Sequence, residues 1–366
     1  MGSRFPGSPV RGKGNWSTLF CVCLAVILFL NIFVWTPLPK TYDDQRETIL
    51  KHVSDVTVEH FDSSHRHQPP SLATTKAKNA FVTFLADDSS NDTTSDPSAD
   101  KYFVAVRILA YQLLHAPETR SQQDIPLVVL VSPHVTQFKR ERLQRDGAII
   151  YEAPVIGSDW IKTDVATWAQ CMAKLNLLKL TQFDRVAFLD SDTVLTGPLE
   201  GVFEDPAVAL QTTGKNPKAI MADEAPMPET YSFAAMVEMN HEHNYPPTEE
   251  HHDFPNINYL NAGFFVVQPS IQLFDYYLSL TKLENRFDPQ LQEQNLLNYA
   301  HRPEGNMPWK MVNTKWNIHY PSSEDVRGGV MSLHEKWWNP EQEDLTLYLH
   351  SWRWRMEGFF EAKDSA

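Results

Sequence analysis

The chain has few cysteines, and their positions exclude a disulfide-stabilised domain. Only three occur among 366 residues, and two of these, Cys21 and Cys23, lie in one apolar run near the N-terminus. Cys171 is the single cysteine of the remainder, so no disulfide can form within it. The remainder must be stabilised by a hydrophobic core, and a chain of this length with 42% hydrophobic residues is long enough to form one.

Positive charge and glycine-rich motifs are also scarce. Lys and Arg number 32 against 46 Asp and Glu, which gives a formal net charge of -14. A protein that binds nucleic acid normally carries a basic surface to neutralise phosphates, so this balance argues against such a partner. No GxGxxG, Walker or GxSxG pattern occurs in the sequence. The signatures of dinucleotide-binding domains, P-loop proteins and α/β-hydrolases are therefore absent.

One long apolar run is present, at residues 19–35, and it predicts a membrane anchor. Three basic residues, Arg4, Arg11 and Lys13, precede the run, and the first acidic residue is Asp43. The run just spans a thin bilayer, and the positive charge keeps its N-terminal side cytoplasmic. The alternative is a cleaved signal peptide, which is disfavoured because the run is longer than usual and no small-x-small site follows.

This anchor predicts a single-pass type II protein of the Golgi membrane. Residues 1–18 are expected to be a cytoplasmic tail, 19–36 the transmembrane signal anchor, 37–77 a polar, lumenal stem, and 78–366 a globular lumenal domain. The short span suits an early secretory or Golgi membrane. The sequon that begins at Asn91 offers a site for a glycan on the lumenal side.

Within the globular part, apolar strand-like segments alternate with segments of helical periodicity. Strands are expected at 80–85, 126–132, 148–153, 185–189 and 261–270, and helices at 101–116, 135–147, 166–183, 270–283 and 288–300. Such alternation predicts an α/β domain with a mostly parallel central sheet flanked by helices. In such sheets ligands bind at the carboxyl ends of the strands.

Asp190-Ser191-Asp192 follows the apolar run 185–189 and is the most informative motif of the chain. Side chains alternate along a strand, so the two carboxylates point the same way. Such a pair suits a hard divalent cation and leaves positions free for phosphate oxygens. A bound cation would neutralise charge on a diphosphate leaving group, as activation of a nucleotide-sugar requires. Asp-x-Asp by itself is also common at turns and solvated strand ends.

Four segments in order resemble family 8 of the retaining glycosyltransferases, which includes glycogenin and bacterial lipopolysaccharide galactosyltransferases. They are AKLNLLKLTQFDRVAFLDSDTVLTGPLEGVF (173–203), YLNAGFFVVQPS (259–270), EQNLLN (293–298) and LHEKWW (333–338). The resemblance covers about residues 79–340. It implies a GT-A-like fold for nucleotide-diphospho-sugar transfer and makes 78–366 the catalytic domain.

The resemblance also implies a role for each matching residue. Asp190, Asp192 and His334 would bind Mn²⁺ or Mg²⁺, and the imidazole favours Mn²⁺. Gln294 would lie near the anomeric carbon and, with Lys174 and the two aspartates, act in catalysis. The other residues expected to contact the UDP-sugar are Phe81, Thr83 and Tyr102 around the uridine, Asn261, Ala262 and Gly263 around the sugar, and Ser191, Glu293 and Lys336.

Several alternatives stay open at this point. His350 follows the apolar run 345–349 and is the second candidate for the third metal ligand. The tryptophans near 352–354 favour packing over sugar stacking. The histidines between 241 and 252 have no compact zinc spacing, and their acidic, proline-containing surroundings are more typical of a solvated loop. The long segment 193–258 is expected to build the acceptor side.

The sequence thus predicts a retaining glycosyltransferase that moves a hexose or N-acetylhexosamine from a UDP-sugar to a glycan acceptor in the Golgi lumen, with UDP as leaving group. The layout is also similar to fungal Golgi N-acetylglucosaminyltransferases. No well-placed carboxylate nucleophile is evident, so front-face attack is expected. The alternatives are a non-catalytic lumenal glycan-binding or assembly partner of the same fold, and a sugar-nucleotide hydrolase.

Overall fold

The computed structural model describes residues 71–86, 97–164, 168 and 170–365. The predicted tail at 1–18, the anchor at 19–36, most of the stem and Asn91 lie outside these residues. Within the part of the chain that is described, no helix is both long enough and apolar enough to cross a bilayer.

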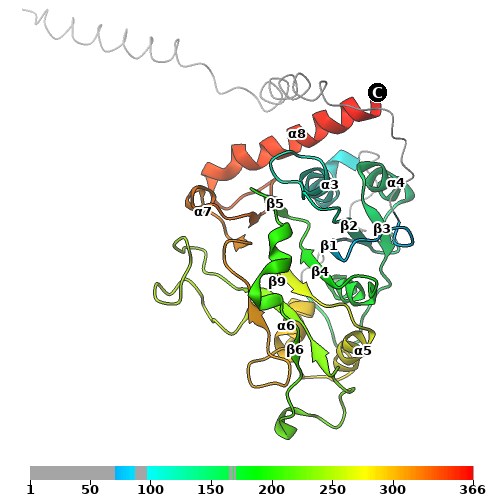
Figure 1. Ribbon diagram of the computed structural model, residues 1–366, viewed down its shortest axis with the longest axis vertical. Helices are drawn as coiled ribbons and strands as arrows, with labels where there is room; N and C mark the ends of the chain where they lie inside the picture. The colour runs from blue at the N-terminus through cyan, green and yellow to red at the C-terminus, as the bar shows by residue number, and fades with distance from the viewer. Residues whose placement is uncertain (1–70, 87–96, 165–167, 169, 366) are drawn as a thin grey trace, which may run out of the picture. The chain divides into compact units, whose positions relative to one another are not determined.

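A seven-stranded sheet forms the centre of the domain (Figure 1), in the order β10-β8-β9-β4-β1-β2-β3. All of its strands run in one direction except β9, which is antiparallel to both β4 and β8. The prediction of a mostly parallel sheet is therefore confirmed. The strands are β1 (Asn79–Leu85), β2 (Leu127–Val131), β3 (Ile149–Glu152), β4 (Arg185–Leu189), β8 (Phe233–Val237), β9 (Leu260–Val267) and β10 (Lys310–Met311).

Helices cover both faces of this sheet. Alternate residues along β1 and β4 belong to two separate hydrophobic clusters, as the period of a strand requires. One cluster includes α3 and α8, which contact each other (Figure 1), and the other includes α5 and α6. The α-helices are α3 (Lys101–Leu114), α4 (Gln137–Asp146), α5 (Ile271–Leu280), α6 (Gln292–Ala300), α7 (Ser323–Gly328) and α8 (Thr346–Ser365).

The α-helix predicted at 166–183 is wrong. The structure has a run of 3-10 turns there, η4 (Cys171–Lys179). Every side chain from Met172 to Leu178 is buried, including those of Lys174 and Asn176. A segment that is buried all round has no solvent-facing stripe, so packing against its neighbours rather than helical periodicity decides its backbone.

A second, three-stranded sheet lies beside the end of β4. It consists of β5 (Thr193–Leu195), β12 (Ser332–His334) and β11 (Ile318–His319), in the order β11-β12-β5. In this sheet His334 is paired with Thr193 on one side and with His319 on the other. Residue 334 is thereby placed next to the residue that follows Asp192.

The remaining elements are short. A two-stranded sheet pairs β6 (Gln211–Thr212) with β7 (Thr230–Tyr231). The other 3-10 turns are η2 (Pro97–Ala99), η5 (Glu200–Glu204), η6 (Pro206–Val208), η7 (Pro217–Ala219), η8 (Pro289–Leu291) and η9 (Glu343–Leu345). In α8 the side chains of Trp352 and Trp354 are buried in the interior, so these tryptophans serve packing, as their sequence context favoured.

Candidate metal and donor site

Two aspartates and one histidine form a possible metal-binding group at the carboxyl end of β4. Asp190, Asp192 and His334 each offer one ligand atom, and these atoms lie within 4.8 Å of one another. The Nε2 atom of His334 is 3.4 Å from Oδ1 of Asp192 and 3.8 Å from Oδ2 of Asp190. Two carboxylates with one imidazole are a donor set that suits Mn²⁺.

A glycine permits this arrangement. An added Cβ at residue 263 would lie 2.2 Å from Cε1 and 2.6 Å from Nδ1 of His334. The backbone carbonyl of Gly263 also accepts a 2.8 Å hydrogen bond from the amide of Asp190. Strand β9 therefore holds the first aspartate through its backbone and makes room for the histidine ring through its missing side chain.

Lys174 joins the metal group to helix α6. Its Nζ lies 2.7 Å from Oδ1 of Asp190 and 2.7 Å from Oε1 of Glu293. Burial alone would lower the pKa of this lysine, but the two carboxylates raise it well above its usual value. The side chain of Lys174 is thus a fixed positive charge next to Asp190.

A second cation approaches Asp192 from the loop after β12. Lys336 Nζ is 3.6 Å from Oδ2 of Asp192, and its side chain is 48% exposed, so it remains accessible to a ligand. Although burial by itself would raise the pKa of Asp192, the hydrogen bond and charge of His334 and the charge of Lys336 lower it well below its usual range. Asp192 is therefore held ionised, which a metal ligand requires.

Hydrogen bonds connect the three residues predicted around the sugar to α6 and to Glu238, the residue after β8. Gln294 Oε1 accepts a 2.9 Å hydrogen bond from the amide of Ala262, and Asn261 Oδ1 accepts one of 2.8 Å from the amide of Gly263. The Nδ2 atom of Asn261 donates to Oε2 of Glu238 at 2.9 Å. These bonds fix both amide side chains before any ligand binds.

Glu238 and His319 belong to this group, although the sequence analysis missed both. Oε1 of Glu238 lies 2.7 Å from Nδ1 of His319, and Oε2 lies 3.5 Å from Nε2 of Gln294. Burial lowers the pKa of His319 despite Glu238, whereas His319 and Asn261 lower the pKa of Glu238 against the effect of burial. Glu238 directly follows β8, a strand that the sequence analysis did not predict, so the strand-end rule that identified Asp190 could not be applied to it. His319 ends a two-residue strand and has no comparable signal.

The predicted uridine contacts are less accessible. Phe81 and Thr83 are completely buried within β1, where the ring of Phe81 packs on Phe203 at 5.4 Å. Phe81 therefore lies in the core and not at an open surface. Tyr102, near the start of α3, meets Trp338 edge-on at 5.0 Å, and its pKa is raised by burial and then by the two metal-group aspartates. Ser191 is buried between these aspartates.

The structure places the other candidate histidines elsewhere. His350 lies in α8, with its ring against Trp337 at 5.8 Å and Trp354 at 6.1 Å. Among the described residues, the group of Asp190, Asp192 and His334 is the one with metal-binding geometry, so the histidines between 241 and 252 form no such group.

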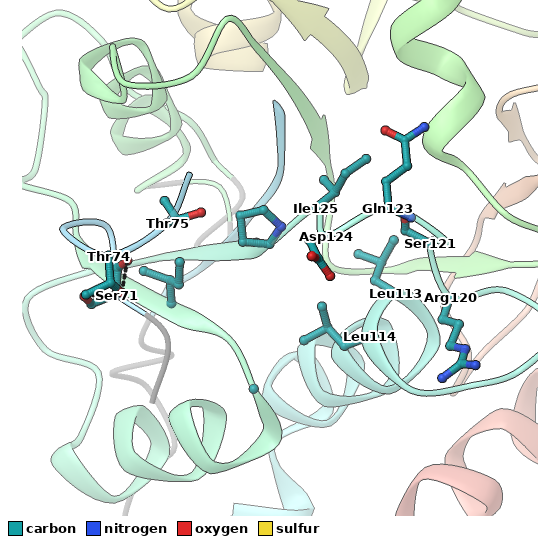
Figure 2. A pocket seen from close by; sticks show the side chains of 13 residues that line it. Ser71, Thr74, Thr75, Leu113, Leu114, Arg120, Ser121, Gln123, Asp124 and Ile125 are labelled. Carbon is teal, nitrogen blue, oxygen red and sulfur yellow. Dashed lines mark hydrogen bonds between the residues drawn. The ribbon is translucent and has the colours of Figure 1, made fainter. Parts of the chain in front are cut away.

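A hollow in the surface lies at the end of the sheet where the parallel strands begin, opposite the end that carries the metal group. Figure 2 shows it between the segment 71–75, the last turn of α3 and the residues that precede β2. It is lined by the amino ends of parallel strands, whereas ligands in such sheets bind at the carboxyl ends. None of the residues of the metal group lines it, so it is not part of the candidate site.

The sequence of this chain is similar to one family model and to two known proteins. Residues 148–301 match the model of the Rhodobacterales glycosyltransferase domain. The uncharacterized protein C4C3.09 of Schizosaccharomyces pombe is 30% identical over 278 residues, which cover 68% of this chain and 71% of the relative. The uncharacterized protein C5H10.12c of the same yeast is 25% identical over 364 residues, with 91% of each chain covered.

The fold is also similar to that of solved structures. The bifunctional glycosyltransferase WbbM, in its apo structure, aligns with a TM-score of 0.46 and 16% identity over 78% of this chain. The alignment spans 52% of the WbbM chain, about half its length.

Proposed function

Because the chain belongs to the family of the Schizosaccharomyces pombe protein C4C3.09 and carries a glycosyltransferase domain, we propose that it is a metal-dependent retaining glycosyltransferase. It moves a hexose or N-acetylhexosamine from a UDP-sugar to a glycan acceptor, and UDP is the leaving group. The family 8 resemblance of the four sequence segments supports the retaining stereochemistry and the uridine nucleotide.

The observation that carries the proposal is the metal group at the end of β4. Asp190, Asp192 and His334 would hold Mn²⁺, which supplies positive charge to the diphosphate as it leaves. Lys336 is half exposed beside Asp192 and would contact the diphosphate oxygens. Lys174 is buried and pairs with the carboxylates of Asp190 and Glu293. Because its side chain does not lie at an open surface, it acts by positioning the carboxylate of Asp190.

The environment of Glu238 favours front-face attack over a covalent intermediate. This carboxylate lies 2.9 Å from Nδ2 of Asn261 and 3.5 Å from Nε2 of Gln294, which makes it a candidate nucleophile in the predicted sugar pocket. However, Oε1 is engaged by His319 and Oε2 by Asn261, and its pKa is lowered. A carboxylate with both oxygens hydrogen-bonded is a weak nucleophile, so Glu238 orients the pocket amides. A glycosyl adduct on Glu238, found by mass spectrometry, would contradict this mechanism.

The location of the enzyme is part of the proposal. We place it in the Golgi membrane as a type II protein, anchored by residues 19–36, because of the apolar run and the basic residues before it. A protease-protection assay on sealed Golgi vesicles tests this: a C-terminal tag should be protected until detergent is added. Digestion of the tag in intact vesicles would contradict the topology.

The decisive experiment measures metal-dependent binding and turnover with the full-length chain. Calorimetry with UDP and Mn²⁺, followed by nucleotide release from a panel of UDP- and GDP-sugars, should give binding and release with at least one UDP-sugar. The double variant Asp190→Asn/Asp192→Asn should lose both. Asp275→Asn is the matched control, because Asp275 is exposed on α5 and is not one of the three residues of the metal group.

The outcomes separate the alternatives. A folded wild-type protein that neither binds UDP nor releases nucleotide would refute the enzyme and support a non-catalytic glycan-binding role. Nucleotide release that no acceptor accelerates would instead indicate a sugar-nucleotide hydrolase.

A further inference from the structure

Four aromatic rings form a stacked column that begins at the metal group. His334 stacks on His319 with 4.7 Å between ring centroids, His319 on Tyr320 with 3.7 Å, and Tyr320 on His241 with 3.8 Å. The planes of neighbouring rings differ by 20° to 24°, so the rings are close to parallel. We refer to these four residues as the ring column.

The ring column runs from the interior to the surface. The exposed fraction of the side chain is 11% for His334, 21% for His319 and 64% for His241. One face of the His241 ring is covered by Tyr320, so the exposure belongs to its other face and its edges. The column therefore connects the metal group to an open ring face.

The outer ring is held in place despite its exposure. Nδ1 of His241 lies 2.6 Å from Oε1 of Glu341, and the ring is stacked on Tyr320. The backbone of Tyr320 has a φ of 57°, in the left-handed region that a bulky residue rarely adopts. Such strain persists where the surroundings enforce it, and it clusters at functional sites. An exposed histidine would ordinarily sample several rotamers, whereas this one is pre-organised.

The loop after β12 links the ring of His241 to the metal group and Lys336. The carboxylate of Glu335 accepts hydrogen bonds from the amide of Lys336 at 2.7 Å and from the amide of Glu341 at 3.1 Å. The segment that contains His334 and Lys336 is thereby bonded to the residue that anchors His241. The open ring face is fixed relative to the metal group both through the column and through this loop.

We propose that the open face of His241, together with Glu341, is the subsite for a neutral sugar of the acceptor glycan. This inference rests on the proposed function. A pyranose ring has a C–H face that packs on an aromatic face, and its hydroxyls donate hydrogen bonds to carboxylates. The carboxylate of Glu341 lies at the edge of this face, with Oε1 2.6 Å from Nδ1 of His241, so an acidic sugar is repelled there.

The test uses the full-length chain saturated with Mn²⁺ and UDP, and saturation-transfer NMR with four p-nitrophenyl glycosides. Three are neutral, the β-N-acetylglucosaminide, the β-galactoside and the α-mannoside, and one, the β-glucuronide, is anionic. At least one neutral glycoside should bind and the glucuronide should not. His241→Ala should weaken that binding about tenfold, as expected for one ring-stacking contact.

Two further variants keep the test specific. His241→Phe retains a ring without the Glu341 hydrogen bond, so it should weaken binding less than about threefold. His251→Ala is the matched control, since His251 is exposed in the same segment and is not part of the ring column. If His241→Phe loses binding as His241→Ala does, the role of His241 is only to hold the loop through its hydrogen bond to Glu341, and the inference is wrong.

Calorimetry of UDP and Mn²⁺ on the same samples separates this inference from the proposed function. Intact UDP binding without binding of any neutral glycoside would overturn the acceptor subsite alone. Unchanged glycoside binding by His241→Ala would overturn it as well. Absence of UDP binding in the wild type would overturn the proposed function and the subsite together.

Discussion

The imidazole of His334 occupies the space that a side chain at Gly263 would fill. An added Cβ would lie 2.2 Å from Cε1 of the ring, which no ordinary contact tolerates. This pair joins two segments 71 positions apart in the sequence: β9 of the central sheet and β12 of the small sheet. The metal group therefore depends on a residue that donates nothing to the metal.

Gly263→Ala should displace the His334 ring and weaken metal binding while the fold is kept. We expect the affinity for Mn²⁺ in the presence of UDP to fall at least tenfold, which is about 1.4 kcal/mol. Calorimetry measures this directly. Gly157→Ala is the control, because an added Cβ at Gly157 meets nothing within 4 Å. Equal Mn²⁺ affinities of the two variants would show that the ring moves without cost.

Lys174→Met should destabilise the protein strongly. The substitution leaves the carboxylates of Asp190 and Glu293 next to each other without the buried charge between them. Breaking such a buried pair costs about 3–5 kcal/mol of unfolding free energy. Urea denaturation measures the loss, and Lys174→Met/Glu293→Gln should recover part of it because one unpaired charge is removed. Strictly additive effects of the two substitutions would contradict the coupling.

Glu238→Gln should slow sugar transfer without changing the affinity for UDP and Mn²⁺. A glutamine has one acceptor oxygen in place of the two that receive His319 and Asn261, so the pocket amides lose their fixed orientation. We expect the transfer rate to fall about 100-fold, equivalent to about 2.7 kcal/mol in the barrier. Glu284→Gln, at an exposed position, is the control. A wild-type rate in the Glu238 variant would remove this residue from the site.

The free energy of unfolding should fall as the pH drops from about 6.5 to 4. Burial lowers the pKa of His301 to about 4, so the unfolded chain binds a proton in this range and the folded chain does not. The stabilisation is complete above the unfolded pKa and is lost as the pH falls towards the folded one. The full effect of this residue is about 3 kcal/mol.

Guanidinium unfolding at a series of pH values measures this dependence. Burial also lowers the pKa of His115 to about 4. Part of the pH dependence of the unfolding free energy should therefore remain in His301→Gln. The exposed His251→Gln should keep the full slope. An unchanged slope in His301→Gln would contradict the assignment.

The apolar runs of the sequence predicted five of the seven strands of the central sheet, and β8 and β10 were missed. The strands β1, β2, β3, β4 and β9 were expected within a few residues of their observed bounds. The α-helix expected at 166–183 was not found, because the side chains of this segment are buried on all sides and periodicity carries no information there. The strand-end rule located Asp190 and Asp192, but it could not locate Glu238 because the preceding strand, β8, was not predicted from the sequence.

The sequence by itself determined an α/β chain with an acidic pair at a strand end and a single cysteine outside its apolar run. Those features depend on residues close together in the chain. Only the tertiary structure decided that His334, and not His350, lies beside the pair, and that His319, Tyr320 and His241 continue from it as a column. Both depend on strands of two or three residues, β11 and β12, whose register is set by packing between distant segments and leaves no periodic signal.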